Sequence, residues 1–347
     1  GGGEGYGGHG RVGGRFDGAA SGAAVLKWVG ITGCGQSRTE RGALEFAREA
    51  EYSKSAVQGV AVAGSLVGGL RLQRCRGGMN VTENVIFDTS DGDSVNVDSG
   101  AGGWVDSGGK VNPAAVDEAC RLTRNVALGL KVTGYDHCGG EMGVRTNFAN
   151  FQVAGHVHLR GNVAAGSFNH GFFVTPDPCA LREARHPPLR SVGYGSMSGN
   201  LAHSTRVGVF LDKGASWCVE AGDFAVVKSF DAGVVFYKAA SRVRLSRLSL
   251  VDCTIGLIVA PVTASRWARV ALKDLVVVGA SAEPGCGYDG DLSRGQCDLR
   301  WDGGAVVPSW LAGGCSQKMG CGVTGGHRRF RRSYPLHQQS SNSSGAG

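Results

Sequence analysis

Long apolar segments are missing from this sequence of 347 residues, and so are several other patterns that would place it in a familiar class. No run of 18 apolar residues occurs, so we expect no helix that spans a membrane. Glycine does not recur at every third position, which excludes a collagen triple helix. No nucleic-acid-binding motif accompanies the net charge of +7, and much of that charge lies in the run from Arg328 to Arg332. We therefore expect a solvated basic surface and no nucleic-acid partner.

The cysteines lack the Cys-x-x-Cys spacing of common metal sites, although there are 11 of them. Two sequons make Asn80 and Asn342 candidates for N-glycosylation. Many cysteines together with sequons favour an oxidising, extracellular location. The sequence begins with Gly1 and shows no signal peptide, so we interpret it as a fragment that starts downstream of one.

Aromatic residues are scarce, at 7%, whereas glycine is abundant, with 59 residues. Small apolar residues and glycine are typical of short strands joined by tight turns, without a large aromatic core. The local composition then divides the chain into three regions. We expect a Gly-rich flexible segment over 1–40, a regular region over 43–281, and a Cys/Gly-rich, basic, largely disordered tail over 282–347. No cofactor is expected in any of them.

A repeat runs through the regular region and is its most informative feature. A short apolar strand, a polar stretch, and a glycine that opens a second apolar strand recur along it, as where Gly208 precedes Val209-Phe210-Leu211. Gly208 and Gly233 are 25 residues apart, and Gly233 and Gly256 are 23 apart. Longer intervals indicate loop insertions, which we place after three residues: Val97, Val132 and Val174.

This period is too short for helical repeats, which need about 33 residues or more, and the leucine ladder of leucine-rich repeats is missing. The pattern predicts an all-β fold, a right-handed parallel β-helix of the pectin-lyase-like kind, with coils stacked about 4.8 Å apart. Turns between its strands favour residues that accept a positive φ. We therefore predict structural corner positions at the recurring asparagines and glycines: Asn84, Asn125, Asn162, Asn200, Gly69, Gly92, Gly171, Gly208, Gly233 and Gly256.

Residues 155–265 carry a series of motifs that resembles the fibrocystin and fibrocystin-L family of large receptor-like surface proteins. The motifs are, in order, Asn162-Val163-Ala164-Ala165-Gly166-Ser167, Gly199-Asn200-Leu201-Ala202-His203-Ser204, Asp231-Ala232-Gly233-Val234 and Leu250-Val251-Asp252. The resemblance implies a parallel β-helix within a large ectodomain, membrane attachment through segments outside this chain, and a role in surface recognition or assembly. The G8 domain that precedes the helix in that family is not recognisable here.

Three pairs of cysteines are expected to form disulfides, the first of which flanks the unit that carries this resemblance: Cys179–Cys218, Cys286–Cys297 and Cys315–Cys321. Cys253 follows an apolar strand, and we expect it to be a buried free thiol. Because 11 is an odd number, at least one cysteine has no partner within the chain.

Four aspartates lie close together in one coil and its exit: Asp88, Asp91, Asp93 and Asp98. Polysaccharide lyases with this fold bind Ca²⁺ through acids on neighbouring coils, and the hydrolases use paired aspartates. Here the acids lie within a single coil, and Asp91-Gly92-Asp93 has the composition of a turn. We favour a turn and keep Asp91, Asp93 and Asp98 as weak candidates for a Ca²⁺ or sugar contact.

His156 and His158 point to one face of a strand, because side chains alternate along it. With a third ligand, this spacing would hold a metal ion. The pair also resembles a His-x-His element of G8-containing surface hyaluronidases, although the Tyr-Pro that precedes that element is missing. We favour two histidines on a solvent-facing strand and predict no metal site.

Two functions stay open at the level of sequence. The first is a non-catalytic extracellular module of a fibrocystin-like, membrane-associated glycoprotein, which binds an extracellular protein or glycan, or scaffolds. It would use one flat sheet and the loops over 98–120 and 175–196. The alternative is a carbohydrate-active β-helix enzyme: a polysaccharide lyase or hydrolase, or a hyaluronidase-like protein. Convergence of Asp91, Asp93, Asp98 and a basic residue in one groove would favour the enzyme. We predict the module and no catalytic activity.

Overall fold

The computed structural model describes residues 9–12, 14–16, 19–35, 42–47, 52–75, 77–90, 92–99, 118–131, 148–155, 157–178, 196–212, 218–236, 242–259 and 269–279. All of them lie in one compact unit that ends at Glu283. The tail expected over 282–347 falls outside the described residues. Within the described part, the regular structure is β-strand apart from one short 3₁₀ helix, η1 (Tyr52–Lys54).

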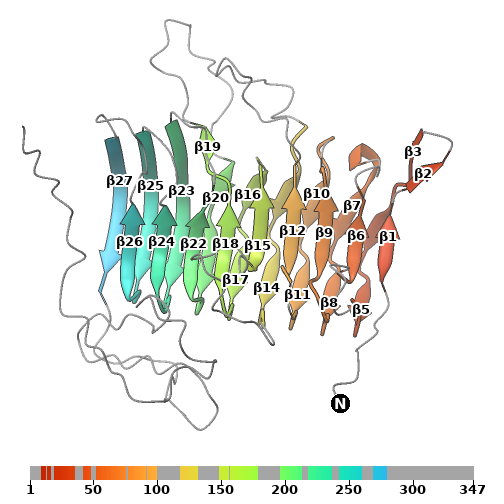
Figure 1. The fold of residues 1–347 in the computed structure, drawn as a ribbon, viewed down its shortest axis with the longest axis horizontal. Coiled ribbons are helices and arrows are strands. Elements are labelled where there is room, and N and C mark those ends of the chain that lie inside the picture. Colours follow the sequence, from red (N-terminus) through yellow and green to blue (C-terminus); the bar gives the residue numbers. More distant parts are fainter. Residues whose placement is uncertain are drawn as a thin grey trace, which may run out of the picture. The chain divides into compact units, whose positions relative to one another are not determined.

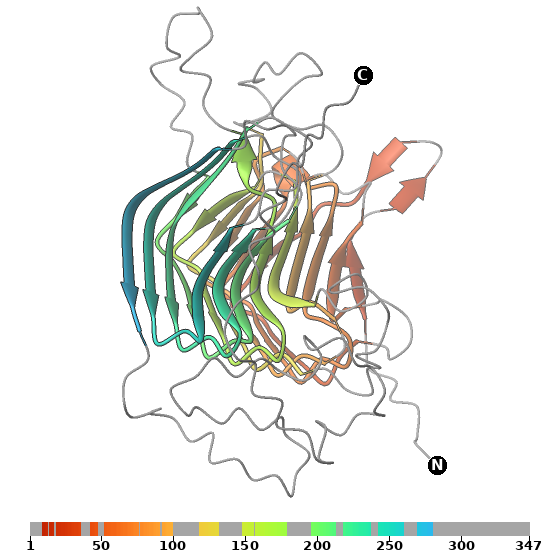
Figure 2. The same ribbon diagram turned by 60° about the vertical axis from the view of Figure 1, so that its left-hand side comes forward.

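Three sheets built almost wholly of parallel strands run along this unit, and the chain visits them in turn (Figures 1 and 2). The six-stranded sheet contains β4 (Val25–Lys27), β7 (Ala56–Gln58), β10 (Asn80–Thr82), β13 (Arg121–Thr123), β16 (His158–Arg160) and β20 (Met197–Ser198). The ten-stranded sheet follows each of these strands with β5 (Gly30–Thr32), β8 (Ala61–Ala63), β11 (Val85–Phe87), β14 (Val126–Leu128), β17 (Val163–Ala165) and β21 (Asn200–His203).

The nine-stranded sheet completes each coil: β1 (Gly10–Val12), β6 (Leu44–Phe46), β9 (Leu70–Gln73), β12 (Val95–Asp98), β15 (Ala149–Ala154), β18 (His170–Val174), β22 (Val207–Leu211), β24 (Ala232–Phe236) and β26 (Ile255–Val259). The ten-stranded sheet ends in three long strands, β23 (Cys218–Val227), β25 (Arg242–Val251) and β27 (Arg269–Val278). Two short antiparallel pairings complete the described strands, β2 (Gly14–Phe16) with β3 (Ala19–Ser21) and β19 (Asp177–Pro178) with β23.

This arrangement is the parallel β-helix that the repeat predicts. The expected start of the helix at residue 43 is wrong, because earlier strands already stack on it. Gly10 of β1 pairs with Leu44, Val25 of β4 with Ala56, and Gly30 of β5 with Ala61. The Gly-rich composition of this region hid these strands, which are only three residues long and include polar residues such as Arg11 and Lys27.

The core lies between the three sheets. It consists of the middle residue of each three-residue strand in the six- and ten-stranded sheets, and of the residues on either side of the central outward row in the nine-stranded sheet. Most are Val, Leu and Ala, but phenylalanine also contributes, so the expectation of a core without large aromatics is wrong. Phe151 and Phe172 stack on neighbouring coils with their ring centroids 5.0 Å apart. The ring of Phe224 meets Phe172 edge-on at 5.5 Å. Aromatic pairs of this kind stabilise beyond the area they bury.

Four of the predicted glycines form a column in the nine-stranded sheet, because Gly171, Gly208, Gly233 and Gly256 occupy one register position on successive coils. Their φ angles are not positive, contrary to the predicted reason for glycine. Space is the reason instead. A Cβ on Gly208 would lie 2.6 Å from the carbonyl oxygen of Gly233 and 2.3 Å from Cγ1 of Val226.

Gly69 belongs to the same column, but Gly92 does not. Register places Ser94 beside Gly69, and Asn150 beside Ser94. Gly92 lies two residues earlier and approaches the backbone at Val67, where an added Cβ would come within 2.6 Å of the carbonyl oxygen. The equal spacing of glycines along the chain therefore misassigned one position, although that position also requires glycine.

Replacing Gly208 with alanine should lower the free energy of unfolding by about 2 to 3 kcal/mol, because the next coil must move to admit the methyl group. Gly30→Ala is the matched control, since nothing lies within 4 Å of a Cβ at that strand position. The control should be neutral or slightly stabilising. Urea unfolding followed by circular dichroism measures both, and equal midpoints for the two variants would contradict the space argument.

Candidate functional site: the outer faces of the helix

Each sheet turns alternate side chains outward, and the three outer faces differ in chemistry. The outer face of the six-stranded sheet begins with the apolar Val25 and Ala56 and is otherwise polar and partly basic, with Lys27, Gln58, Asn80, Thr82, Arg121, Thr123, His158, Arg160 and Ser198. The central outward row of the nine-stranded sheet is polar from Arg11 to Gln152 and becomes apolar at Phe173. There Phe173 and Phe210 stack with parallel rings 5.0 Å apart, and both are buried.

Two outward rows of the ten-stranded sheet contain no acidic residue, lysine or arginine, although the first halves of its long strands carry outward charges such as Glu220 and Arg244. From β5 to β27, the first outward row is Gly30, Ala61, Val85, Val126, Val163, Leu201, Ala225, Ser249 and Val276. The second is Thr32, Ala63, Phe87, Leu128, Ala165, His203, Val227, Val251 and Val278. We call these two rows the apolar strip. Val85 and Phe87 are 42% and 51% exposed, so solvent reaches it.

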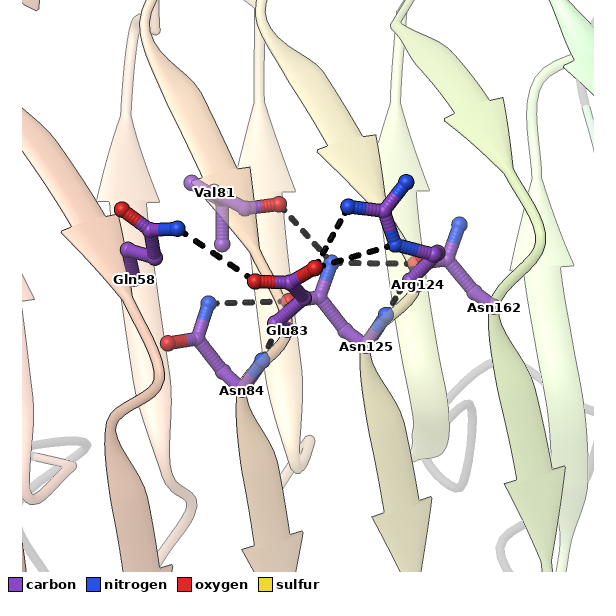
Figure 3. A network of polar contacts seen from close by, with 7 residues as sticks. All are labelled: Gln58, Val81, Glu83, Asn84, Arg124, Asn125 and Asn162. Atoms are coloured by element: carbon purple, nitrogen blue, oxygen red, sulfur yellow. Dashed lines mark hydrogen bonds and ion pairs between the residues drawn. The ribbon is translucent and has the colours of Figure 1, made fainter. Parts of the chain in front are cut away.

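The predicted corner asparagines form a ladder inside the helix, between the six- and ten-stranded sheets (Figure 3). Asn84 donates from Nδ2 to Oδ1 of Asn125 at 2.8 Å, Asn125 to Asn162 at 2.9 Å, and Asn162 to Asn200 at 3.1 Å. Each Nδ2 also donates to a strand carbonyl of the preceding coil, which for Asn125 is that of Val81. The backbone N–H of each of the first three donates to the next Oδ1. All four side chains are thus committed to holding coils together.

The positive φ of this turn belongs to the residue before each asparagine, and not to the asparagine itself as predicted. Glu83 and Arg124 have φ values of 58° and 54°. Asp223, Arg247 and Asp274 take the same position on later coils, with φ values of 59°, 51° and 53°. We call this row of turn residues, which borders the apolar strip, the front margin.

Two ion pairs lie on the front margin. Arg124 donates from Nε to Glu83 at 3.2 Å, and Arg247 donates from Nε to Asp223 at 2.9 Å. Gln58 also donates to Glu83 at 3.3 Å (Figure 3). Hydrogen bonds from Arg124 and Gln58 lower the pKa of Glu83. Because these pairs face solvent, each contributes little to folding on its own, but together they fix a charge pattern along one edge of the strip.

The acidic cluster does not assemble as the enzyme alternative requires in the part that the structure describes. Asp93 is held in the turn before β12, where Oδ1 accepts the N–H of Ala149 at 2.8 Å and Oδ2 accepts the Asn96 amide at 2.6 Å. Asp98 ends β12 and is exposed. Asp91 lies outside the described residues. Among those that are described, no group of three His, Cys, Asp or Glu side chains could hold a metal ion.

Burial raises the pKa of Asp93 to about 7, against the opposing hydrogen bonds from Ala149 and Asn96. The folded protein therefore keeps the Asp93 proton at pH values where the unfolded chain has released it. The free energy of unfolding accordingly falls as the pH rises from about 4 to 7. In Asp93→Asn this decrease is absent. We expect the free energy of unfolding of the variant, relative to wild type, to rise by about 2 to 3 kcal/mol between pH 5 and 7.

Urea titrations of both proteins at several pH values measure this difference. His170 makes the comparison with a variant necessary, because its burial lowers its pKa to about 3 and destabilises the fold as pH falls below 6.5. That opposing slope is common to both proteins and cancels in the difference. A difference that does not change with pH would show that Asp93 is ionised in the folded protein.

The remaining predicted site residues are dispersed. His158 lies on the outer face of β16, and its expected companion His156 is outside the described residues. Cys253 is a buried free thiol, as predicted. Cys218 begins β23, its side chain is not described, and the other five cysteines of the predicted disulfides lie outside the described residues: Cys179, Cys286, Cys297, Cys315 and Cys321.

A disulfide that the sequence did not predict joins Cys75 and Cys120, whose Cα atoms are 5.9 Å apart. Both flank six-stranded-sheet strands, Cys75 before β10 and Cys120 before β13, and both sulfurs are buried in the core. Their separation of 45 residues exceeds the glycine period, because the coil between them carries the insertion after Val97. A search for cysteine pairs separated by the length of one coil plus an insertion would have found them.

Asn80 is exposed on the outer face of β10, whereas Asn342 lies outside the described residues. Within the described strands and turns, no helix is long and apolar enough to cross a membrane. Sequence reasoning did not identify the apolar strip. The signal was available in the short triplets Val85-Ile86-Phe87 and Val126-Ala127-Leu128, whose outer positions are as apolar as their inner ones.

Comparison with known proteins gives one partial match. The sequence is similar to a segment of fibrocystin from the dog, Canis lupus familiaris, with 27% identity over 200 residues. The segment covers 51% of this chain and 5% of fibrocystin, so the chain spans a small part of that relative's length. No protein-family model and no solved structure matches the chain. The predicted relation to fibrocystin is thus supported in part.

Proposed function

We propose that this chain is a non-catalytic extracellular β-helix module of a fibrocystin-like cell-surface protein, which serves recognition or scaffolding. The observation that carries the proposal is the match to fibrocystin. The predicted corner asparagines support it, because their side chains hydrogen-bond to one another and join neighbouring coils. Asp93, the best-placed acid of the predicted cluster, is likewise engaged by Ala149 and Asn96. These side chains build a rigid stack and leave recognition to the outer faces.

The disulfide supports an extracellular location, because disulfides persist mainly in oxidising compartments. Exposure of Asn80 supports the same location, since an oligosaccharide can be attached only where the side chain is accessible. The partner of the module is then an extracellular protein or glycan. The polar face that carries Arg121 and Arg160 offers hydrogen-bond donors to either.

Glycosylation at Asn80 tests the location. When the chain is produced behind a signal peptide in a eukaryotic secretory pathway, we expect a carbohydrate that is removed by an endoglycosidase, with a shift in electrophoretic mobility. Asn80→Gln and Asn342→Gln, singly and together, assign the shift to each sequon. An unmodified Asn80 in a secreted, disulfide-bonded product would count against the exposed position, and retention of a misfolded chain would count against an extracellular module.

Catalysis is tested with the purified chain, in the presence of Ca²⁺, on polygalacturonate, hyaluronan and other acidic polysaccharides. We expect neither the ultraviolet absorbance of an unsaturated lyase product nor new reducing ends. Product formation that disappears in Asp93→Asn or Asp98→Asn would overturn the non-catalytic proposal. A binding measurement on the same polysaccharides separates glycan recognition from turnover.

A further inference from the structure

The apolar strip has the anatomy of a protein interface, with an uncharged centre and charges along its edges. The largest contiguous apolar patch on a monomeric protein, typically a few hundred Å² in area, is often a functional surface. The eight strands from β8 to β27 have their midpoint between β17 and β21, where Val163 and Leu201 point outward. From β11 to β25, the charges of the front margin are placed symmetrically about that same point.

We propose that two copies of this chain pack face to face through the apolar strip, with their helices antiparallel and a twofold axis passing between β17 and β21. This assignment depends on the strip and its margin, and it holds whether or not the module is catalytic. In this arrangement β14 of one copy faces β23 of the other, and β11 faces β25.

The charges of the front margin select this orientation. Gly59 and Asp274 stand at the two ends of this row, beside β8 and in β27, and Asp274 is paired with Lys273 beside it. Between them, from β11 to β25, the charges run negative, positive, neutral, neutral, negative, positive: Glu83, Arg124, Gly161, Gly199, Asp223 and Arg247. Read in reverse, every sign in this series is inverted. An antiparallel copy therefore places Arg247 opposite Glu83 and Asp223 opposite Arg124, so two ion pairs within each chain meet as a four-charge group.

The sizes of the outward side chains also match. Across the twofold axis each larger side chain meets a smaller one: Val85 with Ser249, Val126 with Ala225, and Leu201 with Val163 in the first row. In the second row Phe87 meets Val251, Leu128 meets Val227, and His203 meets Ala165. Two flat faces with this pairing can approach evenly along their length.

The area of the apolar strip determines how strongly two copies are expected to associate. Eight overlapping strands about 4.8 Å apart and three residues wide give a strip of about 340 Å² per copy. Inclusion of the margins roughly doubles this figure, which reaches the lower end of stable interfaces. The rear margin does not share the charge symmetry, because Asp88 would face Asp252, so we expect that edge to stay solvated. A monomer–dimer equilibrium with a dissociation constant of about 1 to 100 μM is the expected result.

Sedimentation of the full chain over this concentration range measures the equilibrium. Leu201→Asp brings two carboxylates together near the twofold axis, and we expect the dissociation constant to rise about 100-fold or more. Ser198→Asp is the matched control, because it introduces the same charge on the same coil but on the outer face of the six-stranded sheet. Equal thermal midpoints of the two variants would show that both are folded.

A fourfold charge exchange tests the orientation. Glu83→Arg, Arg124→Glu, Asp223→Arg and Arg247→Glu together preserve both ion pairs within the chain and the self-complementary series. We expect the exchanged protein to dimerise like wild type, whereas a mixture should form far fewer than the roughly half heterodimers of random exchange. Native mass spectrometry of two differently tagged chains counts them.

A chain that stays monomeric at about 100 μM would overturn the proposal and leave the strip to a different partner. A dimer that Leu201→Asp does not weaken would place the contact elsewhere, for instance at the exposed edge of β27. Heterodimers in random proportion would overturn the antiparallel arrangement.

Discussion

Replacement of Asn125 with leucine should lower the free energy of unfolding by about 3 to 5 kcal/mol. The side chain is fully buried and makes four hydrogen bonds: Oδ1 accepts from the backbone N–H and the Nδ2 of Asn84, and Nδ2 donates to Asn162 and Val81. Leucine has a similar volume, so the loss reports on bonds and not on a cavity. The substitution removes the side-chain hydrogen bonds that join this coil to both of its neighbours.

Asn80→Leu serves as the control for this experiment, because Asn80 lies on the outer face of a strand in the preceding coil. It should change stability by less than about 0.5 kcal/mol in protein made without glycosylation. The double variant of Asn84 and Asn125 should lose less than the sum of the single variants, since the two amides share bonds. If Asn125→Leu lowers the free energy of unfolding by less than about 1 kcal/mol, water molecules have taken over the hydrogen bonds that the Asn125 side chain made.

Removal of the Cys75–Cys120 disulfide should cost about 4 kcal/mol, the chain-entropy value for a closed loop of this length. The double variant Cys75→Ser, Cys120→Ser avoids a stray thiol and should shift the denaturant midpoint without a change of fold in circular dichroism. Cys34→Ser is the control, because Cys34 is a free cysteine at a partly exposed position. Wild-type stability in the double variant would show that the bridged loop is already constrained by the coils themselves.

The fold was predictable because the repeat follows from the geometry of a single coil. Gly208, Gly233 and Gly256 recur where one backbone must approach the next, and Asn162 and Asn200 recur where a buried amide links coils. Two departures from this spacing caused the errors. The glycine that follows Gly69 at the expected spacing is Gly92, but the next position of the column is held by Ser94, two residues later. The insertion after Val97 separates Cys75 from Cys120 by more than one glycine period.

Surface chemistry was less predictable, since a period of two does not tell which side of a strand faces water. The triplet Val163-Ala164-Ala165 is apolar on both sides, and the structure was needed to place Ala164 inside and its neighbours outside. The front margin posed a similar difficulty. Glu83 and Arg124 are 41 residues apart and become neighbours only when coils stack.

The asparagine ladder has a further consequence for how such a chain can change in length. Its amides satisfy one another between coils, and each inner member uses the same bonds as its neighbours. A whole coil added or removed within the run from Asn84 to Asn200 would leave no new unpaired amide. The register passes to Phe224 and then Leu248 beyond it, where packing takes over the role. The coil is therefore the natural unit of insertion and deletion in this molecule, and the ladder is what makes such changes tolerable.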